Sequence, residues 1–139
     1  MKIRADEHVA PRLLQEIREK ALSDPGWDLS HVRDDHGPKT GDEAWITRFA
    51  NDGGNGILSA DRTMLKRPTL VELVRKSGLV AIYLPSSWAR QPLPIQASRL
   101  INWWPKLERK YEEAGPGTIW LIPGGSTGGI REYKDLNSR

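Results

Sequence analysis

Four acidic side chains fall at positions from which their carboxylates could act together on one ligand. Asp6 and Asp61 each end a short run of residues expected to form a β-strand, and Asp42 and Glu43 begin an expected helix. Carboxylates brought close together repel one another, and a divalent cation between them removes that repulsion. Ligand sets made only of oxygen favour Mg²⁺ or Mn²⁺. These acids are therefore the first candidates for a metal site.

The elements that must position these acids follow from the hydrophobic pattern. Apolar residues recur at helical spacing after Pro11, around Trp45, after Pro68 and over residues 95–114. Between these helices lie short runs rich in apolar residues, which predict strands at residues 2–6, 27–32, 57–60, 79–84 and 118–122.

Alternation of strands and helices predicts an α/β fold, a three-layer α/β/α sandwich with a mostly parallel central sheet. The length of 139 residues fits a single domain, expected over residues 1–122 and followed by a Gly-rich polar tail at 123–139. Ligands of open parallel sheets bind beyond the carboxyl ends of the strands. If the first and third strands are both central, Asp6 and Asp61 point into one crevice, which Asp42 and Glu43 could complete.

Each acid also has a structural explanation. Asp6 could simply terminate a strand, and Asp42 suits the first turn of a helix because of the helix dipole. Thr40 and Glu43 have the spacing of a capping box, which would give Glu43 a structural role. Glu7 faces the other way from Asp6 on an extended strand and is a weaker candidate.

Composition excludes several other kinds of chemistry. The chain has no cysteine, so disulfides, thiol catalysis and Cys-based zinc sites are ruled out. Its three histidines lack the spacing of a zinc site, and the glycines at 124–129 lack the Lys of a phosphate-binding loop. No apolar run suits a membrane span or a signal peptide, and because the absence of cysteine suits the cytosol, we expect a cytoplasmic protein. The net charge of +3 is compatible with a polyanionic partner.

Three segments together resemble the PIN-like domain family, in particular the short bacterial toxin-type ribonucleases. Residues 3–9 resemble the opening strand with its Asp-Glu pair, and residues 41–46 resemble the second acidic motif, which begins a helix. Residues 57–62 resemble the third motif, an apolar strand that ends in Asp and a basic residue. The resemblance in order and spacing covers roughly residues 1–67.

The resemblance implies a PIN-like fold and a metal-dependent endoribonuclease that acts as the toxin of a toxin–antitoxin pair. Asp6, Asp42 and Asp61 would hold Mg²⁺ or Mn²⁺, and Glu43 would orient the attacking water. The basic residues beyond the third acid would bind the RNA backbone, unless they are only a solvated surface; they are Arg62, Lys66 and Arg67.

One departure from the family pattern concerns a fourth acid, which such enzymes often carry just after the fourth strand. Here that strand runs into Pro85-Ser86-Ser87-Trp88 without a carboxylate, although Ser86 or Ser87 could bind a water held by the metal. The alternative function is therefore a catalytically inactive PIN-like module that binds RNA or protein. A phosphoacceptor receiver domain is a weaker alternative, because no Lys follows the expected last strand.

Six tryptophans are many for this length. Four of them fall on expected apolar faces and are predicted core residues: Trp27, Trp45, Trp104 and Trp120. Trp88 and Trp103 do not, so the 85–104 segment is expected to offer a surface for an antitoxin or for a homodimer.

Overall fold

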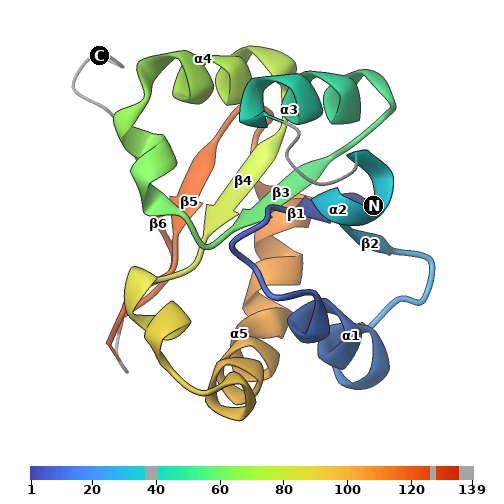
Figure 1. Cartoon of the computed structure of the whole chain (residues 1–139), viewed down its shortest axis with the longest axis vertical. Helices are drawn as coiled ribbons and strands as arrows, with labels where there is room; N and C mark the ends of the chain where they lie inside the picture. Colours follow the sequence, from blue (N-terminus) through green and yellow to red (C-terminus); the bar gives the residue numbers. More distant parts are fainter. Residues whose placement is uncertain (37–40, 126–127, 135–139) are drawn as a thin grey trace.

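A six-stranded sheet forms the centre of the computed structural model, which describes residues 1–36, 41–125 and 128–134. The strand order is β2-β1-β3-β4-β5-β6 (Figure 1), and all neighbours pair in parallel except β5 and β6. The strands are β1 (Lys2–Ala5), β2 (Asp28–His31), β3 (Gly56–Ser59), β4 (Val80–Tyr83), β5 (Ile119–Leu121) and β6 (Arg131–Glu132). The predicted α/β fold is confirmed, and β1 and β3 lie side by side in its interior.

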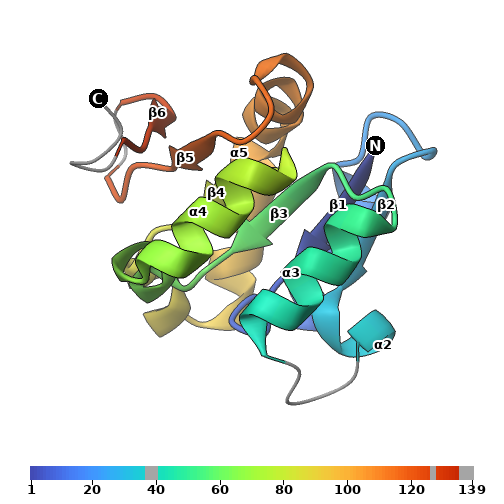
Figure 2. The same cartoon turned by 90° about the horizontal axis from the view of Figure 1, so that it is seen from above.

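Helices cover both faces of this sheet (Figures 1 and 2). The helices α1 (Pro11–Lys20) and α5 (Leu93–Glu113) pack together on one face, and α3 (Asp42–Asn51) and α4 (Pro68–Ser77) pack together on the other. A short helix α2 (Val32–His36) follows β2, and 3₁₀ turns follow β3 and β4: η1 (Arg62–Lys66) and η2 (Ser86–Arg90).

Side chains alternate along the strands between two cores. Leu58 and Ile82 point into the core beneath α1 and α5, whereas Ile57 and Ala81 point into the core beneath α3 and α4. A strand covered on both faces must be apolar on both, which explains the nearly continuous apolar runs in β3 and β4.

Gly56 at the start of β3 lets α5 approach the sheet closely. A Cβ atom built at this position would lie 2.6 Å from the ring of Tyr111, so any larger residue would displace that ring. The Tyr111 hydroxyl donates a hydrogen bond of 2.8 Å to the backbone carbonyl of Ile57. This contact fixes α5 against β3, the strand that leads to Asp61.

Several local expectations need correction. Trp88 was expected on a partner surface, yet it is only 4% exposed and belongs to the core under α5. Trp103 is half-buried and packs against that core, as Trp27 and Trp120 do, whereas Trp45 and Trp104 are fully buried as predicted. The case for a partner surface built on Trp88 is therefore wrong.

Short elements are the other differences. Residues 34–36, which lie in a polar segment without the apolar pattern of a helix, belong to α2, and residues 37–40 lie outside the described part. The segment expected as a polar tail contains β6, which extends the sheet; of that segment, residues 126–127 and 135–139 are not described. None of the described helices is both long enough and apolar enough to cross a membrane.

Candidate active site at the carboxyl edge of the sheet

Asp6 and Asp61 are joined through a single hydroxyl at the carboxyl ends of β1 and β3. Asp6 directly follows β1, and its backbone N–H donates to the carbonyl of Leu58 in the neighbouring strand at 3.0 Å. The hydroxyl of Ser59, the last residue of β3, donates to Asp6 Oδ2 and accepts a hydrogen bond of 3.0 Å from the backbone N–H of Asp61. The two acids thus lie next to each other at this edge, and Ser59 is a site residue that the sequence did not single out.

Asp6 is a buried carboxylate, with 1% of its surface exposed. Burial raises the pKa of the Asp6 carboxyl above its usual range, while the hydrogen bond from Ser59 and the nearby His8 oppose this effect. The other oxygen of Asp6, Oδ1, accepts a hydrogen bond of 3.0 Å from the backbone N–H of His8. A charge buried in this way is stabilised by any cation that approaches it.

Asp61 combines a structural contact with an available oxygen. It caps the turn η1: Asp61 Oδ1 accepts hydrogen bonds from the backbone N–H of Thr63 at 3.0 Å and from its hydroxyl. Asp61 Oδ2 lies 3.8 Å from Nδ1 of His8, whose side chain is largely exposed. The capping role therefore uses one oxygen and leaves the other near His8.

Asp42 and Glu43 stand at the start of α3, where both contact Arg67. Arg67 Nη1 lies 3.3 Å from Asp42 Oδ2, and Nη2 lies 4.0 Å from Glu43 Oε1. The indole N–H of Trp45 donates to Asp42 Oδ1 at 3.1 Å, and the hydroxyl of Thr69 donates to Glu43 Oε1 at 3.3 Å. Because half of the Arg67 side chain is exposed, these ion pairs are of the weak surface type.

The capping box expected for Glu43 requires Thr40 as the N-cap, and the start of α3 does not match it. The residue that caps α3 is Gly41, which has no side chain to donate or accept. Thr40 itself lies outside the described residues. Glu43 is largely exposed and is the outermost of the four acids.

Tyr83 is a buried residue at the end of β4, beside the strand that leads to Asp61. It is paired in register with Ser59 and is 2% exposed. Burial raises the pKa of the Tyr83 phenol well above its usual range. The negative charges of Asp6, Asp61 and Asp42 raise it further, and Glu43 is not among the causes. Tyr83 is therefore a second buried neighbour of the acids that the sequence did not single out.

The donor chemistry suits a hard cation, but the ligands are not assembled around one. Carboxylate oxygens are the groups that Mg²⁺ and Mn²⁺ prefer. Within residues 1–36, 41–125 and 128–134, no three His, Cys, Asp or Glu side chains are grouped closely enough to hold an ion. Arg67 on Asp42 and His8 beside Asp61 are the cationic or ionisable neighbours that a metal ion would displace.

The guanidinium of Arg62 donates hydrogen bonds to backbone carbonyls of the protein. Its Nε donates to the carbonyl of Leu84 at 3.0 Å, and its Nη2 donates to the carbonyls of Tyr83, at 3.4 Å, and Ile122. Burial lowers the pKa of this guanidinium, and the nearby Arg131 adds to the effect. Arg62 therefore ties the ends of β3, β4 and β5 together. Its role as a phosphate contact stays a prediction. Lys66 is exposed, and Arg67 forms ion pairs with Asp42 and Glu43.

The remaining candidates lie at the margin of the site. Ser86 and Ser87 are exposed in η2, and among the described contacts neither is hydrogen-bonded to the acids. His31 is buried, with Nε2 at 2.9 Å from the carbonyl of Val9 and Nδ1 accepting from the backbone N–H of Arg33 at 3.1 Å. Both ring nitrogens therefore have backbone partners, which hold β2 in place.

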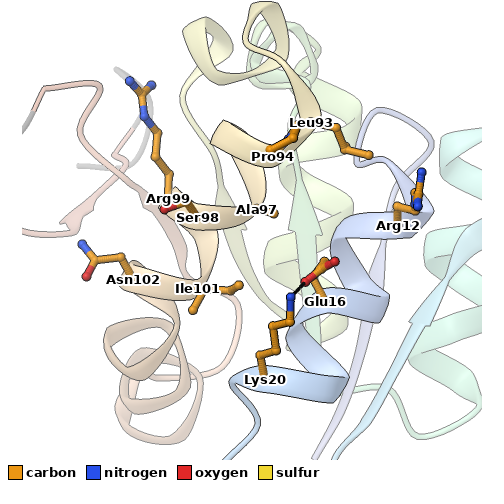
Figure 3. A pocket seen from close by; sticks show the side chains of 10 residues that line it. All are labelled: Arg12, Glu16, Lys20, Leu93, Pro94, Ala97, Ser98, Arg99, Ile101 and Asn102. Atoms are coloured by element: carbon orange, nitrogen blue, oxygen red, sulfur yellow. Dashed lines mark ion pairs between the residues drawn. The ribbon is translucent and has the colours of Figure 1, made fainter.

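A groove of about 770 Å³ lies apart from the acids, between α1 and α5 (Figure 3). Arg12, Glu16 and Lys20 line one side, where Glu16 and Lys20 form an ion pair of 2.6 Å. The other wall is the first half of α5, including Leu93 and Ile101. Part of the 85–104 segment therefore faces this groove.

Fold and site together define an α/β protein whose acidic residues gather at the carboxyl edge of a parallel sheet. A family model described as a PIN-like domain matches residues 1–86, so the chain belongs to the PIN-like domain family. The matched part contains Asp6, Asp42, Glu43 and Asp61 and ends within η2. PIN domains are generally nucleases, and the fold is of this nuclease type. Comparison with curated proteins and with solved structures gives no match.

Proposed function

We propose that this protein is a Mg²⁺- or Mn²⁺-dependent endoribonuclease that hydrolyses RNA phosphodiester bonds. One observation carries the proposal: Asp6 and Asp61 follow the neighbouring strands β1 and β3, and the hydroxyl of Ser59 hydrogen-bonds to both residues. Structural carboxylates have no reason to converge, because each adds to the repulsion felt by the others. A site for a divalent cation gives a reason.

In this proposal Asp6, Asp61 and Asp42 hold the ion, directly or through water. A bound Mg²⁺ or Mn²⁺ would activate water at neutral pH and offset the charge that builds on the phosphate. Ser59 keeps Asp6 and Asp61 in register, since it hydrogen-bonds to both. Glu43, the outermost acid, orients the water that attacks the phosphorus.

Arg67 would change partners when the ion and the RNA bind. It now neutralises Asp42 and Glu43 through contacts of 3.3 and 4.0 Å. A divalent ion on Asp42 removes the attraction that holds the guanidinium there. Arg67 then becomes free to bind a phosphate, together with the exposed Lys66.

The proposal also includes a toxin–antitoxin setting in the cytoplasm. A second protein would inhibit the enzyme by covering the acidic edge, where a basic side chain could replace Arg67 on Asp42. The test is co-purification of the protein with the product of an adjacent gene, followed by RNA cleavage with and without that product. A homodimer is tested by light scattering on the purified chain, and the two assemblies can coexist.

The competing function is an inactive PIN-like module that binds RNA or protein. Two observations favour it: no carboxylate follows β4, and Arg67 already neutralises Asp42 and Glu43. Incubation of structured RNAs with the protein in Mn²⁺, Mg²⁺ or EDTA separates the two functions. We expect cleavage with either metal, none in EDTA, and none by an Asp61→Asn variant prepared in parallel. RNA that stays intact in millimolar Mn²⁺, with binding still measurable, would establish the inactive module instead.

A further inference from the structure

A second concave region lies at the carboxyl edge of the sheet, beyond the part of the chain that the family model matches. It is a cleft of about 310 Å³ between α5, η2 and the glycines after β5. Arg99, Asn102, Trp103 and Lys106 line it from α5, at spacings of three and four residues that place them on one helix face. Figure 3 shows Arg99 and Asn102 on the side of α5 that points away from α1.

The charge in this cleft is positive and uncompensated. Arg99 and Lys106 are the charged residues among those that line it, and neither forms a salt bridge with a carboxylate in the described part of the chain. Lys106 Nζ lies 4.8 Å from the ring centroid of the half-buried Trp103. Two cations beside an indole in a hollow suit a ligand that carries both a phosphate and a flat ring.

The wall of the cleft opposite α5 is made of glycine backbone, which a ligand can approach closely. Gly124 and Gly125 line the cleft, and a Cβ atom added to Gly125 would meet nothing within 4 Å. Glycines of this kind let a phosphate approach backbone N–H groups. Gly124 follows β5 and lies near Pro85 and Ser87, which follow β4, so the cleft opens at the same edge of the sheet as the acids.

Positive charge continues along α5 beyond the cleft. A shallower hollow of about 180 Å³ shares Lys106 and adds Arg109 and Lys110, with Glu113 at its far end. Lys110 Nζ lies 4.0 Å from the ring centroid of Trp120. From Arg99 to Lys110 the helix rises roughly 16 Å, at about 1.5 Å per residue. That length exceeds a single phosphate, which favours an extended polyanion over a mononucleotide.

We propose that this α5 cleft binds the single-stranded part of the RNA that leaves the acidic edge. Arg99 and Lys106 hold one phosphate against the backbone of Gly124 and Gly125, a base packs against Trp103, and Lys110 contacts the next phosphate. The inference rests on the proposed function for its RNA ligand. It adds a binding site outside the carboxylates and an orientation for the strand.

The test is fluorescence anisotropy of a labelled single-stranded RNA of ten nucleotides with the full chain in EDTA, where no cleavage occurs. We expect Arg99→Ala/Lys106→Ala to raise Kd about tenfold or more and to reduce the salt dependence by about two phosphate contacts. Trp103→Leu should weaken binding about fivefold or more, and Trp103→Phe should preserve it. The matched control is Arg48→Ala/Lys76→Ala, which removes the same charge from the last turns of α3 and α4.

The proposal is overturned if the cleft variant binds RNA like wild type, or if the control variant loses as much affinity. It is also overturned if a duplex of the same length binds through the cleft as well as the single strand does. An acidic peptide that depends on Arg99 and Lys106 while RNA does not would assign the cleft to a protein partner. If RNA binding depends on the cleft residues but RNA is not cleaved in Mn²⁺, the proposed nuclease function is wrong and the assignment of the cleft is still supported.

Discussion

Ser59 is the smallest unit on which the candidate site depends. Its hydroxyl donates to Asp6 Oδ2 and accepts from the backbone N–H of Asp61, so both acids are positioned by one atom. A buried acceptor that loses its donor costs about 1–3 kcal/mol. Ser59→Ala should therefore destabilise the fold by about that amount and lower cleavage about tenfold or more, on the scale of groups that orient metal ligands.

The control for Ser59 is Thr63→Ala, which removes a hydroxyl from the exposed side of Asp61. Urea unfolding and RNA cleavage measured on both variants decide the matter. Equal losses in the two variants would mean that Ser59 has no special position.

Asp6 makes a prediction about pH and stability. Its pKa is raised by burial, so the folded state binds the proton more tightly than the unfolded chain does. Stability is then lost as the pH rises from the unfolded value of 3.8 through the raised folded pKa. The Asp6→Asn variant carries no ionisable group at this position and does not lose stability in this way. Its melting temperature should be above that of the wild type at pH 7 without metal, and the difference should shrink toward pH 4. Its RNA cleavage should fall at least about 100-fold.

Thermal melts from pH 4 to pH 8 in EDTA test this directly. A variant that melts below wild type at pH 7 would mean that the ionised Asp6 is already compensated by protein groups, which would remove the need for a cation there.

At the scale of residues, the positions of Asp6 and Asp61 could be predicted from the sequence, whereas their hydrogen-bond partners could not. Each acid ends an apolar run, which is a local pattern. Ser59 and Asp6 are 53 residues apart, and Arg62 is 60 residues from Ile122. Such contacts depend on strand order and on how the side chains pack, and no local pattern carries that information.

At the scale of elements, the long periodic segments were predictable and the short ones were not. The helices around Leu13 and Leu70 follow from their apolar spacing, because one face must be buried. The turn η2 and the strand β6 are five and two residues long, and tertiary contacts decide their conformation. Trp88 shows the consequence: in a Pro-rich segment without periodicity, nothing local indicated that it would be buried.

Trp88 and Trp103 should therefore differ in what they stabilise. Trp88→Ala removes a buried ring from the core under α5 and should cost about 3–5 kcal/mol. Trp103→Ala removes a half-buried ring and should cost clearly less. Urea unfolding of the two variants measures the difference. A Trp88→Ala variant as stable as wild type, but altered in self-association, would restore the surface role that its burial excludes.

At the scale of the whole molecule, the acids lie at the carboxyl edge of the sheet, and positive charge runs along α5 away from that edge. Asp6, Asp61 and Asp42 follow β1, follow β3 and begin α3, whereas α5 carries Arg99, Lys106 and Lys110. An RNA strand is repelled by the first region until a cation neutralises it, and is attracted by the second. Metal binding and RNA binding should therefore favour each other, since each removes a repulsion that opposes the other.

The metal itself can be tested without RNA. A ligand that binds only the folded state raises the free energy of unfolding by about 2.7 kcal/mol at a hundredfold excess over its Kd. Mn²⁺ should therefore raise the melting temperature of the wild-type protein, and EDTA should reverse the rise. Asp61→Asn should abolish it. Arg67→Ala should shift the response to lower Mn²⁺ concentrations, because Arg67 competes with the ion for Asp42.

The direction of the Arg67 effect is the sharpest part of this prediction. Loss of any positive charge would slightly raise the affinity of the protein for a cation. Lys76→Ala, which removes one positive charge from α4, is therefore the matched control. An equal gain in both variants would reduce the Arg67 effect to net charge. A wild-type protein that shows no melting shift in millimolar Mn²⁺ would contradict the metal site as a whole. In that case Arg67 would be a permanent partner of Asp42 and Glu43, and the acidic edge would be part of an inactive PIN-like module.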